Sequence, residues 1–299
     1  MDYLEHVRAD SARLGAVARR GLDAPVPSCP GWTVDDAVRH VAQVYVHKIE
    51  VLKHGALPDP WPLDFSGLKT MEWYDETRAA IVAALEQAGT ELPTWTFSPR
   101  DSTSGFWYRR MAHETVIHRI DVEQAHDAVT PIDPELALDG IDEVLYPTVA
   151  GPWWEEGDTK FPVDATVRIT TPTHAWTLQA TATTITVQQD TPSQLTPPTS
   201  APPHHPPPTG DAAPPHQPPT TGDAAPPHQP STTGDAASPH HPSTTGDPVV
   251  AGDAAVVVFG EPAQVYLWLW GRAGDEVVQA SGDLDVLRAF RGRVSEATQ

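Results

Sequence analysis

The feature that most limits how this chain of 299 residues can fold is a twelve-residue repeat within residues 191–248. Gly-Asp pairs begin at residues 210, 222, 234 and 246, and the unit TTGDAAPPHQPP is rich in proline and threonine. A repeat of this composition cannot bury a core, so we expect a disordered insertion. Six of the fourteen histidines lie in it, at residues 204, 205, 216, 228, 240 and 241. These histidines could scavenge metal, but a tandem duplication tolerated in a surface loop is the simpler interpretation.

The chain before the repeat has the pattern of helices. Apolar residues recur at helical spacing in residues 2–20 and 34–52, and Thr33 followed by Asp36 resembles a capping box. We expect further helices over 66–88, with Ser66 as a cap, and over 105–125. A fifth helix is predicted over 133–151, because Asp133-Pro134 combines an N-cap residue with proline at the first helical position.

The pattern changes after residue 154. Alternating residues rich in valine, isoleucine and threonine predict strands over 163–171, 175–182, 185–190 and 254–260. Helices are predicted over 262–272 and 284–294. We therefore predict an α+β chain with three parts: a helical bundle over 1–152, a small α/β domain over 153–190 plus 249–299, and the insertion over 191–248.

Charge and composition exclude several classes of function. A net charge of −21 argues against nucleic acid and against anionic membranes as partners. The single cysteine, Cys29, allows no intramolecular disulfide and fits a reducing cytoplasm. The first residues lack the basic and apolar regions of a signal peptide, and no apolar run is long enough to span a bilayer. We expect a soluble cytoplasmic protein. No serine-hydrolase elbow, phosphate loop or dinucleotide fingerprint is present.

The run HETVIH, residues 113–118, is the strongest candidate for a functional site. It differs from the zinc-protease motif H-E-x-x-H, because His113 and His118 are five residues apart, about 500° around a helix, and face different directions. Glu114 and His118, four residues apart, share one face. If this stretch is helical, it offers two metal ligands and needs a third from elsewhere.

Three histidines of the second predicted helix could supply that third ligand. His40, His47 and His54 recur every seven residues, so they lie close to one helical face but two turns apart. Only one of them can reach a given metal ion. His40 lies among the apolar residues of the core side, and metal sites are often built between facing helices of a bundle.

The run CPGWTVDDAVRH, which ends at His40, together with Glu114, His118 and Asp121, resembles the mycothiol-dependent maleylpyruvate isomerase family. The N-terminal domain of that family is a DinB-like four-helix bundle. The run Leu269-Trp270-Gly271-Arg272 resembles part of its second, small α/β (SCP2-like) domain. The resemblance covers about residues 1–190 and 249–295, and the repeat is a departure from the family.

The resemblance implies that His40, Glu114 and His118 bind a divalent metal, most simply zinc, with an open fourth position. Mycothiol would be the thiol cofactor, and its thiolate would add to the activated double bond of an unsaturated dicarboxylic acid such as maleylpyruvate. Arg272 is the matching candidate for stabilising developing negative charge, with a helix cap as its alternative role. Asp121 would orient a metal ligand or be an ordinary charged residue.

Two other functions stay open at this point. The same site could transfer mycothiol to electrophiles without isomerisation. Alternatively, the bundle could be a non-catalytic metal-binding or regulatory protein, in which a fourth protein ligand closes the site. His113, His47 and Cys29 are the donors available for that role, although Cys29 is more simply a small buried residue.

Overall fold

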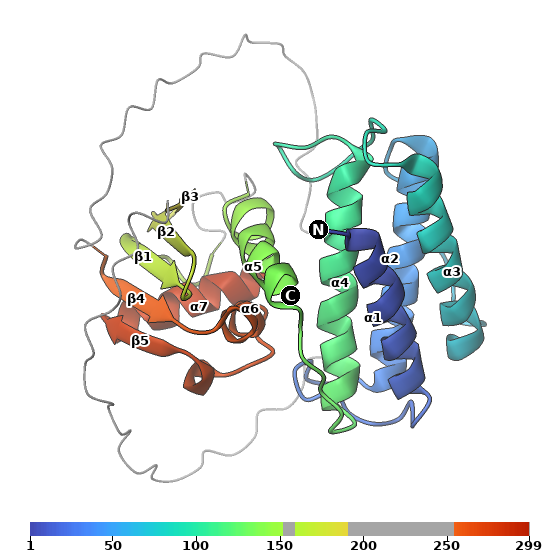
Figure 1. Cartoon of the computed structure of the whole chain (residues 1–299), viewed down its shortest axis with the longest axis horizontal. Coiled ribbons are helices and arrows are strands. Elements are labelled where there is room, and N and C mark those ends of the chain that lie inside the picture. Colours follow the sequence, from blue (N-terminus) through green and yellow to red (C-terminus); the bar gives the residue numbers. More distant parts are fainter. Residues whose placement is uncertain (152–158, 191–253, 299) are drawn as a thin grey trace.

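The structure is a computed structural model that describes residues 1–151, 159–190 and 254–298 (Figure 1). The predicted insertion over residues 191–248 lies outside these ranges, so its disorder stays a prediction. Within the described ranges, no helix is both long enough and apolar enough to cross a membrane.

The N-terminal part is a bundle of four helices, as the apolar spacing predicts (Figure 1). The helices are α1 (Tyr3–Ala18), α2 (Val34–His54), α3 (Thr70–Ala88) and α4 (Ser104–Gln124). Helix α4 packs against both α1 and α2, and almost all of its residues from Met111 to Glu123 are buried. The face of α4 that carries Glu114 and His118 is therefore inside the protein.

Helix α2 is bounded by two local signals in the sequence. The Thr33 hydroxyl accepts from the Asp36 N–H, and the Asp36 carboxylate accepts from the Thr33 N–H at 2.8 Å, which completes the predicted capping box. At the other end, Gly55 has a φ of 68°, and its N–H donates to the Val51 carbonyl at 2.8 Å. This left-handed conformation favours glycine and ends the helix.

The prediction that Ser66 caps the third helix is wrong. Helix α3 begins at Thr70, and its N-cap residue, Lys69, makes no capping hydrogen bond through its side chain. Ser66 lies in a turn, where its N–H donates to the Asp64 carboxylate at 2.9 Å and the Leu68 N–H donates to the Phe65 carbonyl. The local hydrogen bonds of this turn use the backbone groups that an earlier helix start would need.

The second part is a five-stranded mixed sheet with helices packed on it. Its strands are β1 (Ala165–Thr170), β2 (Ala175–Ala180), β3 (Ile185–Gln189), β4 (Val256–Phe259) and β5 (Gln279–Gly282). They lie in the order β3-β2-β1-β4-β5, with β1 and β4 parallel and all other neighbours antiparallel. Sequence analysis missed β5, which is fully exposed and carries no apolar alternation.

The helices of this part are α5 (Pro134–Glu143), α6 (Pro262–Leu269) and α7 (Leu284–Thr298), with a short 3-10 helix, η3 (Asp275–Val277). Asp133 caps α5 as predicted. The fifth helix does not continue regularly to residue 151: after Glu143 it widens into a π-helical segment, η1 (Val144–Val149), which contains Pro147. Proline has no N–H for a regular helical hydrogen bond.

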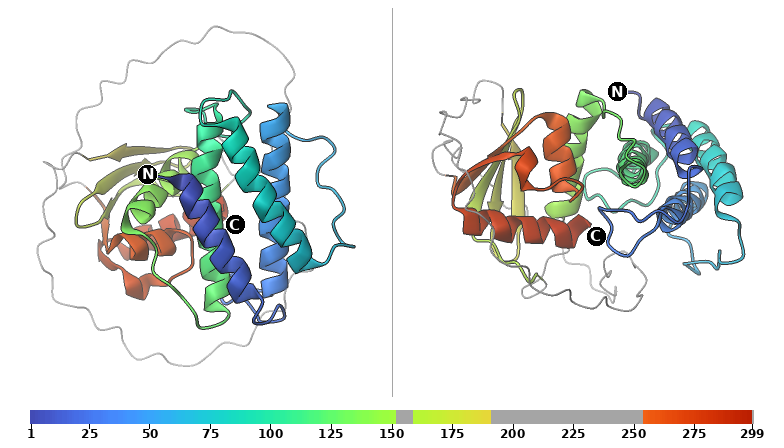
Figure 2. Two further views of the ribbon diagram at one scale, coloured as in Figure 1. Left: turned by 45° about the vertical axis from the view of Figure 1, so that its right-hand side comes forward. Right: turned by 90° about the horizontal axis from the view of Figure 1, so that it is seen from below.

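Helix α5 packs closely against α6, although the predicted domain boundary at residue 152 places α5 with the bundle. A Cβ atom added at Gly140 would lie 2.4 Å from the Tyr266 ring, so the two helices approach at a position that only glycine allows. Figure 2 shows α5 and α6 between the sheet and the bundle. The boundary itself stays a prediction.

Candidate metal centre

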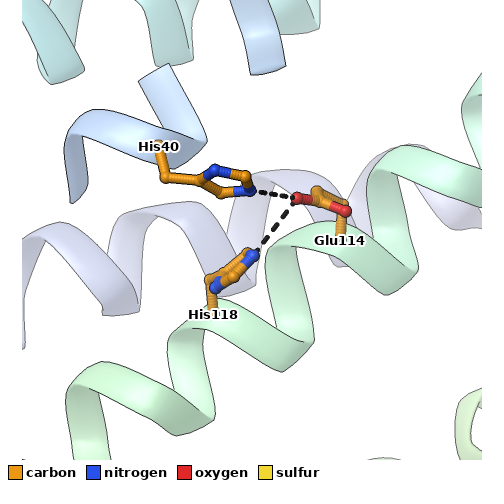
Figure 3. Close-up of side chains that lie close together, drawn as sticks. All are labelled: His40, Glu114 and His118. Carbon is orange, nitrogen blue, oxygen red and sulfur yellow. Dashed lines mark hydrogen bonds and ion pairs between the residues drawn. The ribbon is translucent and has the colours of Figure 1, made fainter. Parts of the chain in front are cut away.

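Three side chains predicted as metal ligands come together between α2 and α4 (Figure 3). His40 Nε2 and His118 Nε2 each lie 3.2 Å from Glu114 Oε1. One ligand atom from each residue lies within 4.8 Å of the other two. The helical turn between Glu114 and His118 places both on one face of α4, and His40 faces them from α2.

This arrangement fits a small divalent metal. Ligand atoms around a tetrahedral zinc, at bond lengths of about 2.0–2.1 Å, are roughly 3.4 Å apart. The two separations of 3.2 Å agree with that spacing. Two imidazoles and one carboxylate are also a donor set that zinc accepts. The His40 side chain is 32% exposed, against 9% for His118, so the centre opens to solvent on the His40 side.

Asp121 holds His118 from the side opposite to the candidate metal position. Its Oδ2 lies 2.9 Å from His118 Nδ1, so the ring can donate to the carboxylate and present Nε2 to a metal. Burial alone would lower the pKa of His118, but the hydrogen bonds to Asp121 and Glu114 outweigh burial and raise it to about 9. Without a metal, the His118 ring is therefore protonated on both nitrogens and positively charged at neutral pH.

Arg110 holds Glu114 in a similar way. It binds Glu114 Oε2, and its Nη1 donates to both carboxylate oxygens of Glu143 at 2.8 and 2.9 Å. Burial would raise the pKa of Glu114, but Arg110 and the two histidines hold it well below its usual range. Sequence analysis missed Arg110, although its position four residues before Glu114 is a weak signal of an ion pair along a helix.

Arg272 joins the C-terminal part to this network. Its Nε and Nη2 donate to Asp121 at 2.9 and 3.0 Å, and its Nη1 donates to the Trp270 carbonyl at 2.7 Å. Burial would raise the pKa of Asp121, but His118 and Arg272 hold it well below its usual range. The observed position of Arg272 is therefore that of a partner for the residue that orients His118.

Cys29 and Ser28 lie at the edge of the same network. Ser28 Oγ donates to Asp121 at 2.6 Å, and Cys29 Sγ lies 3.4 Å from Arg272 Nη2. Burial and the charge of Asp121 raise the pKa of the Cys29 thiol to about 11. A pocket of about 500 Å³ has Ser28, Arg272 and Arg291 in its wall.

Trp32 covers the two histidine rings. Its ring lies nearly parallel to that of His118, with centroids 6.3 Å apart and an interplanar angle of 15°. Its centroid is 5.2 Å from that of His40. The indole therefore limits the rotation of both rings, while His40 keeps its solvent-exposed edge.

The other candidate histidines lie elsewhere. His113 is fully buried, where Nε2 lies 2.8 Å from Asp139 and Nδ1 lies 3.1 Å from the Tyr266 hydroxyl. His54 pairs with Glu50 near the surface, and the His47 ring contacts Trp61 edge to face. In the described part of the chain, no fourth histidine, cysteine or carboxylate joins the three candidate ligands.

The comparison with protein families agrees with this geometry. Residues 4–123 match the family model described as the mycothiol maleylpyruvate isomerase N-terminal domain. The bundle belongs to this domain family. The match contains all three candidate ligands and Asp121, and it ends within the last turn of α4. No curated protein and no solved structure gave a match.

The description of this domain family connects it with mycothiol, and its match covers the four helices of the bundle apart from their outermost residues. The sheet and helices after residue 123 lie outside the match, including Arg272. Metal binding, the identity of the metal and the reaction are therefore matters for proposal.

Proposed function

We propose that this protein is a zinc-dependent enzyme that uses mycothiol as its thiol cofactor and isomerises an unsaturated dicarboxylic acid. The observation that carries the proposal is the convergence of His40, Glu114 and His118 inside a domain of the mycothiol maleylpyruvate isomerase type. The fixed positions of their ligand atoms support binding of a metal at that point.

The absence of a fourth ligand in the described residues favours a catalytic centre over a structural one. Structural zinc sites are closed by four protein ligands, whereas catalytic sites keep one position for water or substrate. Cys29, the alternative donor, is occupied by Arg272 and Asp121. His113 and His47 face other partners. A regulatory protein with a closed site is therefore the weaker alternative.

The chain's own residues would prepare the centre in three ways. Asp121 fixes the His118 ring so that Nε2 faces the centre. Arg110 holds Glu114 Oε2, which leaves Oε1 for a metal. Trp32 packs against both histidine rings and limits their movement. A divalent metal bound there would supply Lewis-acid chemistry that keeps a thiol ionised at neutral pH.

The candidate catalytic roles of Arg272 and Asp121 belong to this proposal. Arg272 would stabilise developing negative charge on the substrate, and Asp121 would keep both Arg272 and His118 in place. The pocket of about 500 Å³ beside Arg272 and Ser28 offers room for the body of mycothiol, and Arg272, Arg291 and Ser28 supply polar groups in its wall. A cytoplasmic location, where this thiol cofactor is expected, stays part of the proposal.

Elemental analysis tests the metal centre. We expect one zinc per chain in a protein whose six repeat histidines are replaced by glutamine, so that the repeat cannot contribute. His40→Ala and His118→Ala should lose this zinc. His113→Gln is the matched control on α4 and should keep it. Loss of zinc in the control alone would place the metal elsewhere.

Activity then separates the two enzymatic functions. The zinc-loaded protein with mycothiol should convert maleylpyruvate into its trans isomer, with mycothiol regenerated. Consumption of mycothiol and accumulation of a stable conjugate with an electrophile would identify an S-transferase instead. If the zinc-loaded protein catalyses neither reaction, the alternative of a non-catalytic metal-binding protein is favoured.

A further inference from the structure

Lys48 is a partly buried cation near the candidate centre. It lies on α2, eight residues after His40, which corresponds to about 12 Å along the helix axis. Side chains on a helix tilt toward its N-terminus, and the Lys48 Nζ contacts Nδ1 of the preceding residue, His47, at 3.0 Å. Its Nζ lies 4.5 Å from the centroid of the Trp107 ring on α4. Lys48 therefore occupies the same helix–helix contact as the metal centre.

The charge of Lys48 has no partner among the described residues. The hydrogen bond of its Nζ is to His47 Nδ1, at 3.0 Å, which is a neutral acceptor. Among the described residues, the lysines that form ion pairs are Lys53, with Glu50, and Lys69, with Glu72, and no carboxylate pairs with Lys48. Burial lowers the pKa of Lys48 to about 8, and the charge of Glu114 opposes that shift. A metal bound to Glu114 would neutralise the negative charge of Glu114. The positive charge of Lys48 would then be stabilised less by that carboxylate.

The arginines around the centre differ from Lys48 because each already binds carboxylates. Arg110 binds Glu114 and Glu143, and Arg272 binds Asp121. Arg109 binds Asp139 and Asp142. Capture of a further carboxylate by any of these would require breaking an existing ion pair. A buried charge without a partner is costly, so Lys48 is the cation that an incoming anion would stabilise most.

A buried polar group without a hydrogen-bond partner lies beside Arg110. Trp270 is only 8% exposed, and its Nε1 donates to no atom of the described residues. Its ring centroid lies 5.1 Å from the Arg110 guanidinium. Buried indole N–H groups normally have an acceptor. The charge of Glu114 acts on Lys48, and Trp270 lies beside Arg110, which binds Glu114. Lys48 lacks a carboxylate partner and Trp270 Nε1 lacks an acceptor, and a carboxylate would satisfy either group.

We infer that Lys48 binds a carboxylate of the substrate, at the end remote from the metal centre. Trp270 Nε1 would supply a further hydrogen bond to the bound acid. The inference rests on the proposed function, because it names the residue that would hold the remote carboxylate of the dicarboxylic acid proposed there as the substrate. Lys48 is thus a positioning and specificity-determining residue, and its aromatic neighbour Trp107 keeps the ammonium group in place.

Binding of succinate, an unreactive dicarboxylate, tests the inference in the full-length, zinc-loaded protein. Isothermal titration should show that Lys48→Met weakens succinate at least about tenfold, as for loss of a charge-assisted hydrogen bond. Lys48→Arg should restore most of the affinity. Succinamide, which has the same carbon chain and no charge, should bind equally weakly to the wild type and to Lys48→Met.

Lys53→Met is the matched control, because Lys53 lies on the same helix with its side chain 63% exposed. It should leave succinate affinity unchanged. Unchanged affinity in Lys48→Met, or no succinate binding by the wild type at millimolar concentration, would overturn the inference. Thermal unfolding of each variant shows whether a loss of binding reflects misfolding. If Lys48→Met is misfolded, succinate binding by Lys48→Arg decides whether a positive charge at this position is required.

Zinc content measured on the same samples keeps the two proposals apart. A wild-type protein without zinc would refute the proposed metal centre. The comparison of wild type with Lys48→Met would still decide the role of Lys48 in the metal-free protein. Trp270→Phe, which removes the indole N–H donor and keeps an aromatic ring, should weaken succinate binding by a smaller factor than Lys48→Met.

Discussion

Arg272 donates both Nε and Nη2 to the two carboxylate oxygens of Asp121, at 2.9 and 3.0 Å, across a separation of 151 residues. Asp121 also holds His118, a candidate metal ligand of the bundle. Arg272 comes from the segment after α6. The Asp121 carboxylate therefore binds both Arg272, from the C-terminal part, and His118, from the bundle. The orientation of the His118 ring thus depends on a contact between the two parts of the protein.

Replacing Arg272 should weaken metal binding without removing any ligand. In Arg272→Gln, Asp121 loses its ionic partner and orients His118 less firmly, so zinc affinity should fall about 10- to 100-fold. Competition with a coloured chelator measures this. Arg288→Gln, at a position whose side chain is 72% exposed, is the control and should leave the affinity unchanged. Equal zinc affinities in both variants would mean that Asp121 orients His118 without help from Arg272.

Zinc binding should release a proton from His118. In the metal-free protein its pKa is raised to about 9, above the ordinary 6.5, so the ring is protonated at neutral pH. The stability that this charged ring contributes is fully present below pH 6.5 and is lost as the pH rises through 9. Zinc affinity should rise over the same range. Calorimetry in buffers of different ionisation enthalpy would show the released proton, and identical heats in all buffers would contradict it.

Cys29 should be a slow nucleophile in the folded protein. Its pKa is raised to about 11 from 9.0, mainly by burial and then by Asp121, so its thiolate fraction at mildly alkaline pH is about a hundredfold below that of a free thiol. Mass spectrometry can follow alkylation of this single cysteine by iodoacetamide. The unfolded protein is the reference and should react at the ordinary rate. Equal rates in both states would refute the assigned environment.

The contact between α5 and α6 should be sensitive to one methyl group. Gly140→Ala places a Cβ 2.4 Å from the buried Tyr266 ring, and this overpacking should destabilise the protein by about 1–3 kcal/mol. The control is Gly67→Ala, where an added Cβ meets no atom within 4 Å. Thermal unfolding compares the two variants. A Gly140→Ala protein as stable as the control would show that α5 and α6 move apart easily.

The elements that the sequence predicts well are those set by local chemistry. The capping box of Thr33 and Asp36 starts α2, and the angular spacing of HETVIH correctly separates His113 from the other two polar residues. His40 needed the family resemblance, because three histidines of α2 satisfy the same helical spacing. Once α2 and α4 face each other, only His40 lies level with Glu114.

The features that escaped sequence analysis depend on tertiary contacts. Arg110 is one of many Arg-x-x-x-Glu pairs that a helix can contain, and only its burial between Glu114 and Glu143 gives it a role. Strand β5 is short and polar, so only its pairing with β4 defines it. The assignment of α5 to the layer above the sheet likewise follows from its contact with Tyr266.

The pairing of β4 beside β1 has a consequence for how the chain could be divided. The Asp190 N–H donates to the Ala175 carbonyl, and the Ala255 N–H donates to the Thr166 carbonyl. Asp190 and Ala255 are therefore each hydrogen-bonded to the sheet independently of the other. A polypeptide that ends at residue 190 and a second one that starts at residue 254 would contain between them every described hydrogen bond. Two co-expressed fragments should therefore reassemble through the pairing of β4 with β1. The fragment that starts at residue 254 would then supply Arg272 as the partner of Asp121.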